Sequence, residues 1–161
     1  MRNQYKLLAE KYDQVLEADQ KPTLRKGPGG IKKWYQNGML HRLDGPAVEY
    51  RNGTKNWYQN GKIHRLDGPA IEHSSGAKYW YQNDKRHRLD GPAIEDPQGF
   101  KYWYQNGMLH RLNGPAIERP DGSKEWHIDG IEYNEKEFDL KKRTRELLKK
   151  ASDETGIEMD I

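Results

Sequence analysis

The chain has 161 residues and no cysteine, and its 28 basic and 25 acidic side chains leave a formal net charge of +3. This length suits one domain, and the absence of cysteine excludes disulfides, a thiolate zinc site and a thiol nucleophile. No apolar run is long enough to span a membrane, and the first residues lack the apolar segment of a signal peptide. The sequence therefore predicts a cytoplasmic protein without a membrane segment.

Residues 1–21 are predicted to form an N-terminal helix. Apolar side chains recur there at three- and four-residue spacing in one narrow stripe, formed by Tyr5, Leu8, Tyr12 and Val15 or Leu16. The next stretch, residues 22–29, is rich in proline and glycine. Because both residue types break regular structure, it is predicted to be a linker.

A 23-residue repeat fills the middle of the chain. Tryptophan recurs at this spacing at Trp34, Trp57, Trp80, Trp103 and Trp126. The motif His-Arg-Leu-Asp-Gly-Pro-Ala begins at His41, His64 and His87, and it returns at His110 with Asn113 in place of aspartate. Residues 30–133 therefore hold four and a half copies of one structural unit.

Turn signals in each copy predict two β-hairpins. Asn-Gly, as at residues 60–61, favours a two-residue type I′ turn that places Trp57 opposite His64. The second hairpin closes on a glycine at residue 76, which places Glu72 opposite Lys78 and Ala70 opposite Trp80. Glutamate also falls opposite lysine in the equivalent hairpins. The predicted fold class is therefore mainly β, a one-dimensional antiparallel β-hairpin array flanked by two helices.

A C-terminal helix is predicted over residues 134–152, followed by a frayed tail over residues 153–161. Asn134 and Glu137 form an N-terminal capping signature, and Tyr133 and Phe138 occupy the positions of a hydrophobic staple. We expect both terminal helices to cover the ends of the repeat array, because exposed end repeats need caps. Dimerisation or partner binding through these helices is the alternative.

The repeat resembles a known family. Its pattern Trp-Tyr-Gln-Asn-Gly-x-x-His-Arg-Leu-Asp-Gly-Pro-Ala-x-Glu is similar to the MORN-like hairpin repeats of bacteriophages and large DNA viruses. It shares the 23-residue period and the Asn-Gly-x-x-His core with ordinary MORN repeats, but arginine follows the histidine where those repeats have glycine. The resemblance covers about residues 30–133. It implies an extended curved β-sheet with an interaction or scaffold role.

The recurring histidines do not form one reactive centre. Catalytic and metal sites need groups that converge on one point, whereas these stations are nearly identical and spread along the chain. We therefore expect no enzyme activity, no cofactor and no metal. The tryptophans and histidines are instead predicted to form a structural ladder, made up of Trp34, Trp57, Trp80, Trp103, Trp126, His41, His64, His87 and His110.

Positions that differ between otherwise similar repeats are the predicted binding residues, because no shared structural role fixes them. One such row contributes Met39, Lys62 and Met108, and the other contributes Tyr50, His73 and Arg119. Methionine and arginine are adaptable contact residues, and the methionine, histidine and arginine of these rows are expected to lack a partner in their own hairpin. The alternative is that both rows are only solvated and the terminal helices carry the contact.

The predicted function is that of a non-enzymatic protein-interaction repeat module. The family resemblance extends this prediction to a phage or viral factor that binds and modulates a host defence protein in the host cytoplasm. Binding of single-stranded nucleic acid or an anionic small ligand along the repeat surface is the alternative, with phosphates near Arg65 and Lys78. The glutamate expected opposite each such lysine argues against nucleic acid. Neither a membrane nor a specific oligomer is predicted, although the helices offer a route to a homo-oligomer.

Overall fold

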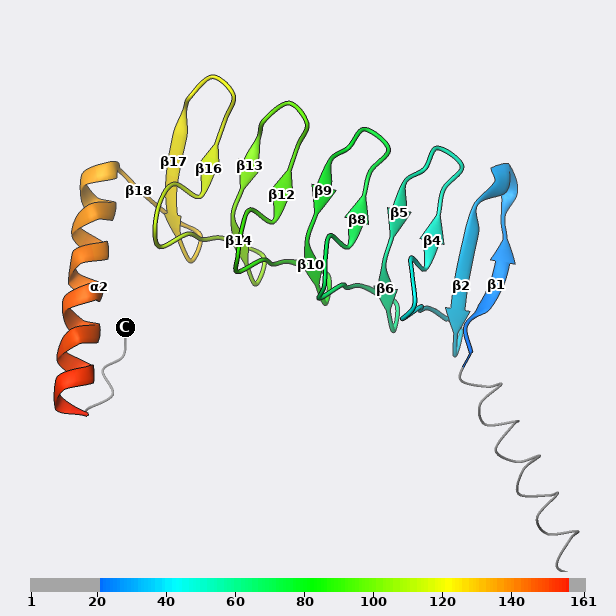
Figure 1. Ribbon diagram of the computed structural model, residues 1–161, viewed down its shortest axis with the longest axis horizontal. Helices are drawn as coiled ribbons and strands as arrows, with labels where there is room; N and C mark the ends of the chain where they lie inside the picture. Colours follow the sequence, from blue (N-terminus) through cyan, green and yellow to red (C-terminus); the bar gives the residue numbers. More distant parts are fainter. Residues whose placement is uncertain (1–20, 157–161) are drawn as a thin grey trace, which may run out of the picture. The chain divides into compact units, whose positions relative to one another are not determined.

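The computed structural model describes residues 21–156 (Figure 1). The helix expected over residues 1–21, apart from its last residue, and the tail residues 157–161 lie outside this range. The fold is mainly β, because antiparallel hairpins provide twelve strands of sheet before a C-terminal helix. This confirms the predicted antiparallel hairpin class. Contacts divide the chain into two compact units, Met1–Asp84 and Lys85–Ile161.

The first unit contains an antiparallel sheet and short side hairpins. Its sheet order is β1 (Thr23–Lys26), β2 (Lys32–Gln36), β4 (Val48–Glu49), β5 (Lys55–Asn56), β8 (Ile71–Glu72) and β9 (Lys78–Tyr79). Strand β3 (Met39–Leu40) pairs with β2, while β6 (Tyr58–Gln59) and β7 (Lys62–Ile63) form a separate ladder; β10 (Tyr81–Gln82) completes the unit. Each complete repeat thus supplies two hairpins. We call the hairpin in the main sheet, such as β8 with β9, the long hairpin, and the hairpin beside the sheet, such as β6 with β7, the short hairpin.

The second unit repeats this arrangement and ends in a helix. Its sheet order is β12 (Ile94–Glu95), β13 (Lys101–Tyr102), β16 (Ile117–Glu118), β17 (Lys124–Ile128) and β18 (Ile131–Tyr133). Its side strands are β11 (Lys85–Arg86), β14 (Tyr104–Gln105) and β15 (Met108–Leu109), of which β14 and β15 pair with each other.

The predicted strand registers are confirmed in both kinds of hairpin. Glu72 lies opposite Lys78, and the equivalent pairs are Glu49 with Lys55, Glu95 with Lys101 and Glu118 with Lys124. In the short hairpin the His64 amide donates to the Trp57 carbonyl at 3.1 Å. The turn chemistry therefore fixes the register, because Asn60 and Gly61 both adopt the positive φ angles of a type I′ turn.

The ladder of the long hairpin stops one residue short of the expected pair of Ala70 with Trp80. It is two residue pairs deep and ends at Ile71 opposite Tyr79. The strand is interrupted at Trp80, between β9 and β10, where the chain leaves the main sheet for the next short hairpin. On its other side, the Ala70 carbonyl accepts a hydrogen bond from the Trp57 amide at 2.8 Å.

Residues 22–29 are not a linker, contrary to the prediction. Strand β1 pairs with β2 over four residues, with Leu24 opposite Trp34, and a short 3-10 helix, η1 (Pro28–Gly30), follows. Pro22 and Pro28 lie outside the strand, so neither removes a donor from its ladder. Strand β1 covers the edge of the first repeat, whose backbone groups would otherwise lack partners.

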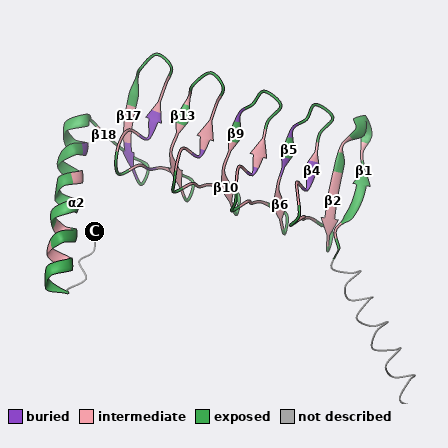
Figure 2. Cartoon of the chain, viewed as in Figure 1, coloured by how far each residue is buried: buried purple, intermediate pink, exposed green. Residues whose placement is uncertain are grey.

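Small side chains make up most of the buried core, whereas the tryptophans are only half-buried. Figure 2 shows buried positions on sheet strands such as β4 and β16. The buried apolar residues are Ala47, Val48, Ala70, Ala77, Ala93, Ala116, Ile117, Ile128 and Phe138. The alanine of each Gly-Pro-Ala segment sits where two backbones meet; for example, the Ala47 carbonyl accepts from the Trp34 amide at 2.9 Å. Small side chains therefore fill the places where the backbones approach each other closely.

Helix α2 (Glu135–Thr155) begins with the predicted capping box. The Asn134 side chain accepts from the Glu137 amide at 3.0 Å, and the Glu137 carboxylate accepts from the Asn134 amide at 3.2 Å. The helix extends to Thr155, beyond the predicted end, and stops at Gly156, whose φ is 68°. Phe138 is its buried side chain. No helix in the described part of the chain is long and apolar enough to cross a membrane.

Candidate functional site

The His-Arg-Leu-Asp-Gly-Pro motif forms the loop that returns from each short hairpin to the main sheet. We call these segments the leucine loops; they comprise residues 41–46, 64–69, 87–92 and 110–115. The four complete repeats therefore carry the same loop at the same place, and the structure shows what its histidine, arginine and glycine contribute to the fold.

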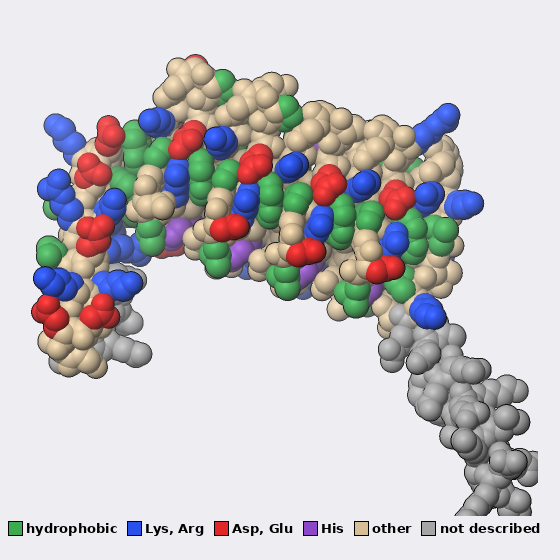
Figure 3. All heavy atoms as spheres, viewed as in Figure 1, with side chains coloured by type: hydrophobic (Ala, Val, Ile, Leu, Met, Phe, Trp, Pro, Cys, Tyr) green, Lys and Arg blue, Asp and Glu red, His purple; other side chains and the backbone are tan. Residues whose placement is uncertain are grey.

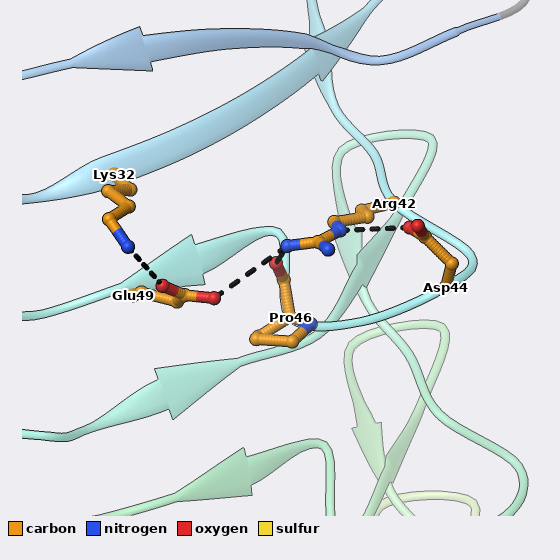
Figure 4. A network of polar contacts seen from close by, with 5 residues as sticks. All are labelled: Lys32, Arg42, Asp44, Pro46 and Glu49. Carbon is orange, nitrogen blue, oxygen red and sulfur yellow. Dashed lines mark hydrogen bonds and ion pairs between the residues drawn. The ribbon is translucent and has the colours of Figure 1, made fainter.

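The arginine of each loop is held inside its own repeat. The Arg65 guanidinium lies over the Trp57 ring with its Cζ 4.1 Å from the ring centroid. It donates to Asp67 at 2.9 Å and to Glu72 at 3.1 Å, and also to the Pro69 carbonyl at 3.2 Å. Figure 4 shows the equivalent network at Arg42. The planar guanidinium fits this site because it stacks on a ring and donates in several directions at once.

The guanidinium closely approaches the glycine of each loop. A Cβ on Gly68 would lie 3.0 Å from the Arg65 Cζ, and a Cβ on Gly91 would lie 2.7 Å from the Arg88 Cζ. Neither glycine has a φ in the left-handed region. These glycines therefore differ from Gly53, whose φ of 89° reflects the turn of a long hairpin.

The aspartate of each loop stays ionised and exposed. A hydrogen bond from the arginine two residues earlier lowers the pKa of the Asp44, Asp67 and Asp90 carboxyls. Their side chains are nevertheless 82%, 84% and 84% exposed. Each of these loops therefore presents a negative charge to solvent, and the fourth loop presents neutral Asn113 at the same position.

The histidine of each loop supports the turn of the following repeat. The Asn60 amide donates to Nδ1 of His41 at 3.1 Å, and the Asn60 side chain lies 2.9 Å from the same nitrogen. The same contact joins His64 to Asn83, His87 to Asn106 and His110 to Asp129. These histidines thus bond to separate turns and do not converge on one point.

The leucine of each loop is left facing solvent. The exposed fractions are 72% for Leu43, 73% for Leu66, 74% for Leu89 and 44% for Leu112. On the face drawn in Figure 3, hydrophobic side chains next to acidic ones recur with each repeat. Exposed leucine is common singly, but a recurring apolar row beside polar groups is typical of an interaction surface.

Successive leucine loops enclose a groove in each unit. In the first unit a groove of about 470 Å³ is lined by Leu43 and Leu66, with Trp57 and His64 among the other lining residues. In the second unit a groove of about 620 Å³ is lined by Leu89 and Leu112. Both grooves combine leucine and tryptophan with charged and polar groups, so each offers contacts to an apolar side chain that has polar neighbours.

The first row of predicted binding residues lies on the short hairpins. Met39 and Met108 are about half-exposed, at 45% and 46%. Their side chains pack beside Gly61 and Gly130 in the turns of the following hairpins. Lys62 is exposed on β7. These residues lie on strands β3, β7 and β15, each of which leads directly into a leucine loop.

The second row lies near the tips of the long hairpins, away from the leucine loops. Tyr50 is 37% exposed. Contrary to expectation, His73 and Arg119 have partners inside their own hairpins. Nδ1 of His73 lies 2.8 Å from the Ser75 hydroxyl, and Arg119 donates to the Ser123 hydroxyl at 3.3 Å and forms an ion pair with Glu125. The two rows therefore do not form one binding surface.

Sequence reasoning misses the leucines, because residues that are identical in the complete repeats indicate a shared structural role. The sequence nonetheless holds a signal: each leucine stands between arginine and aspartate, or asparagine after Leu112, in a segment of turn residues with no apolar neighbour in alternation. No protein-family model, curated protein or solved structure matches the chain. The geometry of the loops is therefore the basis for the function proposed below.

Proposed function

We propose that the chain is a non-enzymatic protein-interaction module that binds its partner through the leucine loops. The observation that carries this proposal is the exposure of Leu43, Leu66 and Leu89, at 72–74%, in loops whose arginine, aspartate and glycine all serve the fold. Nothing in the packing requires leucine at these positions. A binding role explains why an apolar side chain recurs there.

The spacing of the loops defines the partner that would fit. Each repeat adds two strands to the sheet, so equivalent loops within a unit stand about 10 Å apart. Seven residues of α-helix cover about 10.5 Å, and three residues of extended chain cover about 10 Å. A protein segment with apolar side chains at either spacing would contact both leucine loops of a unit.

The charge of the loops specifies the partner further. Asp44, Asp67 and Asp90 place exposed carboxylates beside the leucines. A partner segment with lysine or arginine flanking its apolar residues would match this pattern. Following the family resemblance described above, we propose a host protein in the cytoplasm as the partner of a phage or viral factor.

Nucleic-acid binding is less well supported. Each loop arginine that would meet a phosphate is already paired with carboxylates of its own repeat, as Arg65 is with Asp67 and Glu72. Phosphate binding would have to break these pairs. The exposed groups beside the grooves are leucine and aspartate, which offer nothing to a phosphate backbone.

The test compares two pairs of exposed leucines. Leu66→Ser with Leu89→Ser removes two loop side chains, and Leu140→Ser with Leu147→Ser removes two side chains of α2 that are 67% and 69% exposed. Proteins retained by the immobilised wild-type chain are identified, and the affinity of each variant for the purified partner is measured. The loop variant should bind at least about 10-fold more weakly, which is ~1.4 kcal/mol, while the helix variant binds like wild type.

Two results would contradict the proposal. In the first, the loop variant keeps wild-type affinity. In the second, the helix variant loses affinity as much as the loop variant does, which would move the contact to α2 or indicate a general loss of apolar surface.

A further inference from the structure

The final hairpin brings three metal-ligating side chains to one face of the sheet. Strands β17 and β18 pair with His127 directly opposite Glu132. Glu125 lies two residues before His127 on the same strand, so its side chain leaves the same face. We call Glu125, His127 and Glu132 the final-hairpin cluster.

The donor atoms of this cluster are close enough to share one ion. One ligand atom from each residue lies within 4.8 Å of the other two. A Glu125 carboxylate oxygen lies 3.1 Å from Nε2 of His127. His127 is buried, Glu125 is half-buried and Glu132 is exposed. The cluster is thus partly shielded by the protein and open to solvent on one side.

The protein alone does not satisfy the His127 imidazole. The residue is only 7% exposed, and its Nδ1 is buried without a hydrogen-bond partner. Buried polar atoms normally have a partner, so each exception calls for an explanation. This nitrogen points away from Nε2, which lies 3.1 Å from the Glu125 carboxylate, so Nε2 is the imidazole nitrogen that meets a ligand at the cluster.

The cluster is unique to the last repeat. The positions equivalent to His127 hold tyrosine in all four complete repeats, at Tyr35, Tyr58, Tyr81 and Tyr104. The positions equivalent to Glu132 hold leucine, isoleucine or arginine, and those equivalent to Glu125 hold lysine, asparagine or tyrosine. A polar end face would explain charge in a terminal repeat. It would not explain why three donor groups meet at one point.

We propose that the final-hairpin cluster binds one divalent transition-metal ion, with Zn²⁺ as the test case. An imidazole and two carboxylates suit such ions, and three protein ligands leave a coordination position for water. Arg119 forms an ion pair with the second oxygen of Glu125 and positions this carboxylate. This site lies outside the leucine loops, so its test does not depend on the function proposed above.

The two carboxylate oxygens of Glu125 have different neighbours. One pairs with Arg119, and the other lies 3.1 Å from Nε2 of His127. The latter oxygen is therefore beside the imidazole nitrogen that would share the ion. The sequence-based expectation of no metal considered only the repeated histidines of the ladder.

The test uses the full-length chain freed of metal with a chelator and titrated with Zn²⁺ by calorimetry. The wild-type chain should bind one equivalent in a saturable step. Glu132→Gln removes an exposed ligand with little change in shape, and His127→Tyr restores the residue of the other repeats. Each variant should lower the affinity for this equivalent at least about 10-fold. His73→Gln, which removes an exposed imidazole elsewhere, should leave it unchanged.

Three results would overturn the proposal. The first is the absence of a stoichiometric binding step in the wild-type chain. The second is wild-type affinity in both Glu132→Gln and His127→Tyr, with circular dichroism showing that they are folded. The third is a loss of the same step in His73→Gln, which would assign the binding to exposed histidines in general.

Discussion

Gly91→Ala tests whether the loop glycines exist to admit the arginine. A Cβ at this position would lie 2.7 Å from Cζ of Arg88 and 3.0 Å from its Nε. The guanidinium cannot retreat freely, because it donates to Asp90 at 3.0 Å and to Glu95 at 2.7 Å. Crowding of this kind lowers the free energy of unfolding by about 1–3 kcal/mol.

Part of this cost is offset in the unfolded chain. Gly91 has no left-handed φ, so alanine fits its backbone conformation and reduces the entropy of the unfolded state, which stabilises by about 0.4–1 kcal/mol. The net expectation is a destabilisation of about 1–2 kcal/mol. For a chain of this size that corresponds to a fall in Tm of about 2–8 °C, measurable by calorimetry or circular dichroism.

Two further variants make the experiment decisive. Gly27→Ala is the matched control, because its backbone is also outside the left-handed region and its nearest contact is 3.9 Å away; it should be neutral or slightly stabilising. In an Arg88→Ala background, Gly91→Ala should no longer lower the free energy of unfolding, because the guanidinium that the new Cβ would crowd is gone. If Gly91→Ala destabilises equally with and without Arg88, the close-approach explanation is wrong.

Three other predictions follow from the same structure. Leu66→Ser should change the free energy of unfolding by no more than about 0.5 kcal/mol, whereas Ile117→Ala, at a buried site, should lower it by about 2–5 kcal/mol. Both values are measured by chemical unfolding, and a similarly large decrease in Leu66→Ser would show that this leucine has a packing role. Asn134→Ala should cost about 1 kcal/mol and speed amide exchange in the first turn of α2, because it removes the capping box; unchanged exchange there would contradict this. The pKa of Glu125 is lowered from 4.5 by Arg119 and His127, so its stabilisation is present above the unfolded pKa and is lost as pH falls through the folded pKa. Below about pH 4.5, the free energy of unfolding of Glu125→Gln should therefore fall less steeply with decreasing pH than that of wild type. Identical plots of stability against pH would refute a stabilising role for the Glu125 carboxylate.

The sequence predicts the hairpins well because their turns are strongly specified. Asn60-Gly61 admits few backbone conformations, and a one-residue slip would separate Glu72 from Lys78. Even the third short hairpin follows this rule, with Asp84 in place of glycine at a φ of 65°. Its side chain accepts from the Ile63 amide at 2.8 Å, which offsets the strain of that conformation.

Features that depend on contacts between distant residues could not be predicted in the same way. Strand β1 is preceded by Pro22 and followed by Gly27 and Pro28, which indicates a linker, but the edge of β2 supplies hydrogen-bond partners that local sequence does not show. The arginine of each loop occupies the space beside its tryptophan and leaves the leucine outside. The final-hairpin cluster requires the register of β17 with β18, which brings Glu132 opposite His127.

Site-specific photo-crosslinking tests the central claim that the leucine loops contact the partner. A photoreactive side chain placed at position 66 projects from a loop where leucine is 73% exposed, and one placed at position 140 projects from α2 where leucine is 67% exposed. The account predicts a covalent adduct with the same protein partner from position 66 and none from position 140. An adduct from position 140 alone would contradict it.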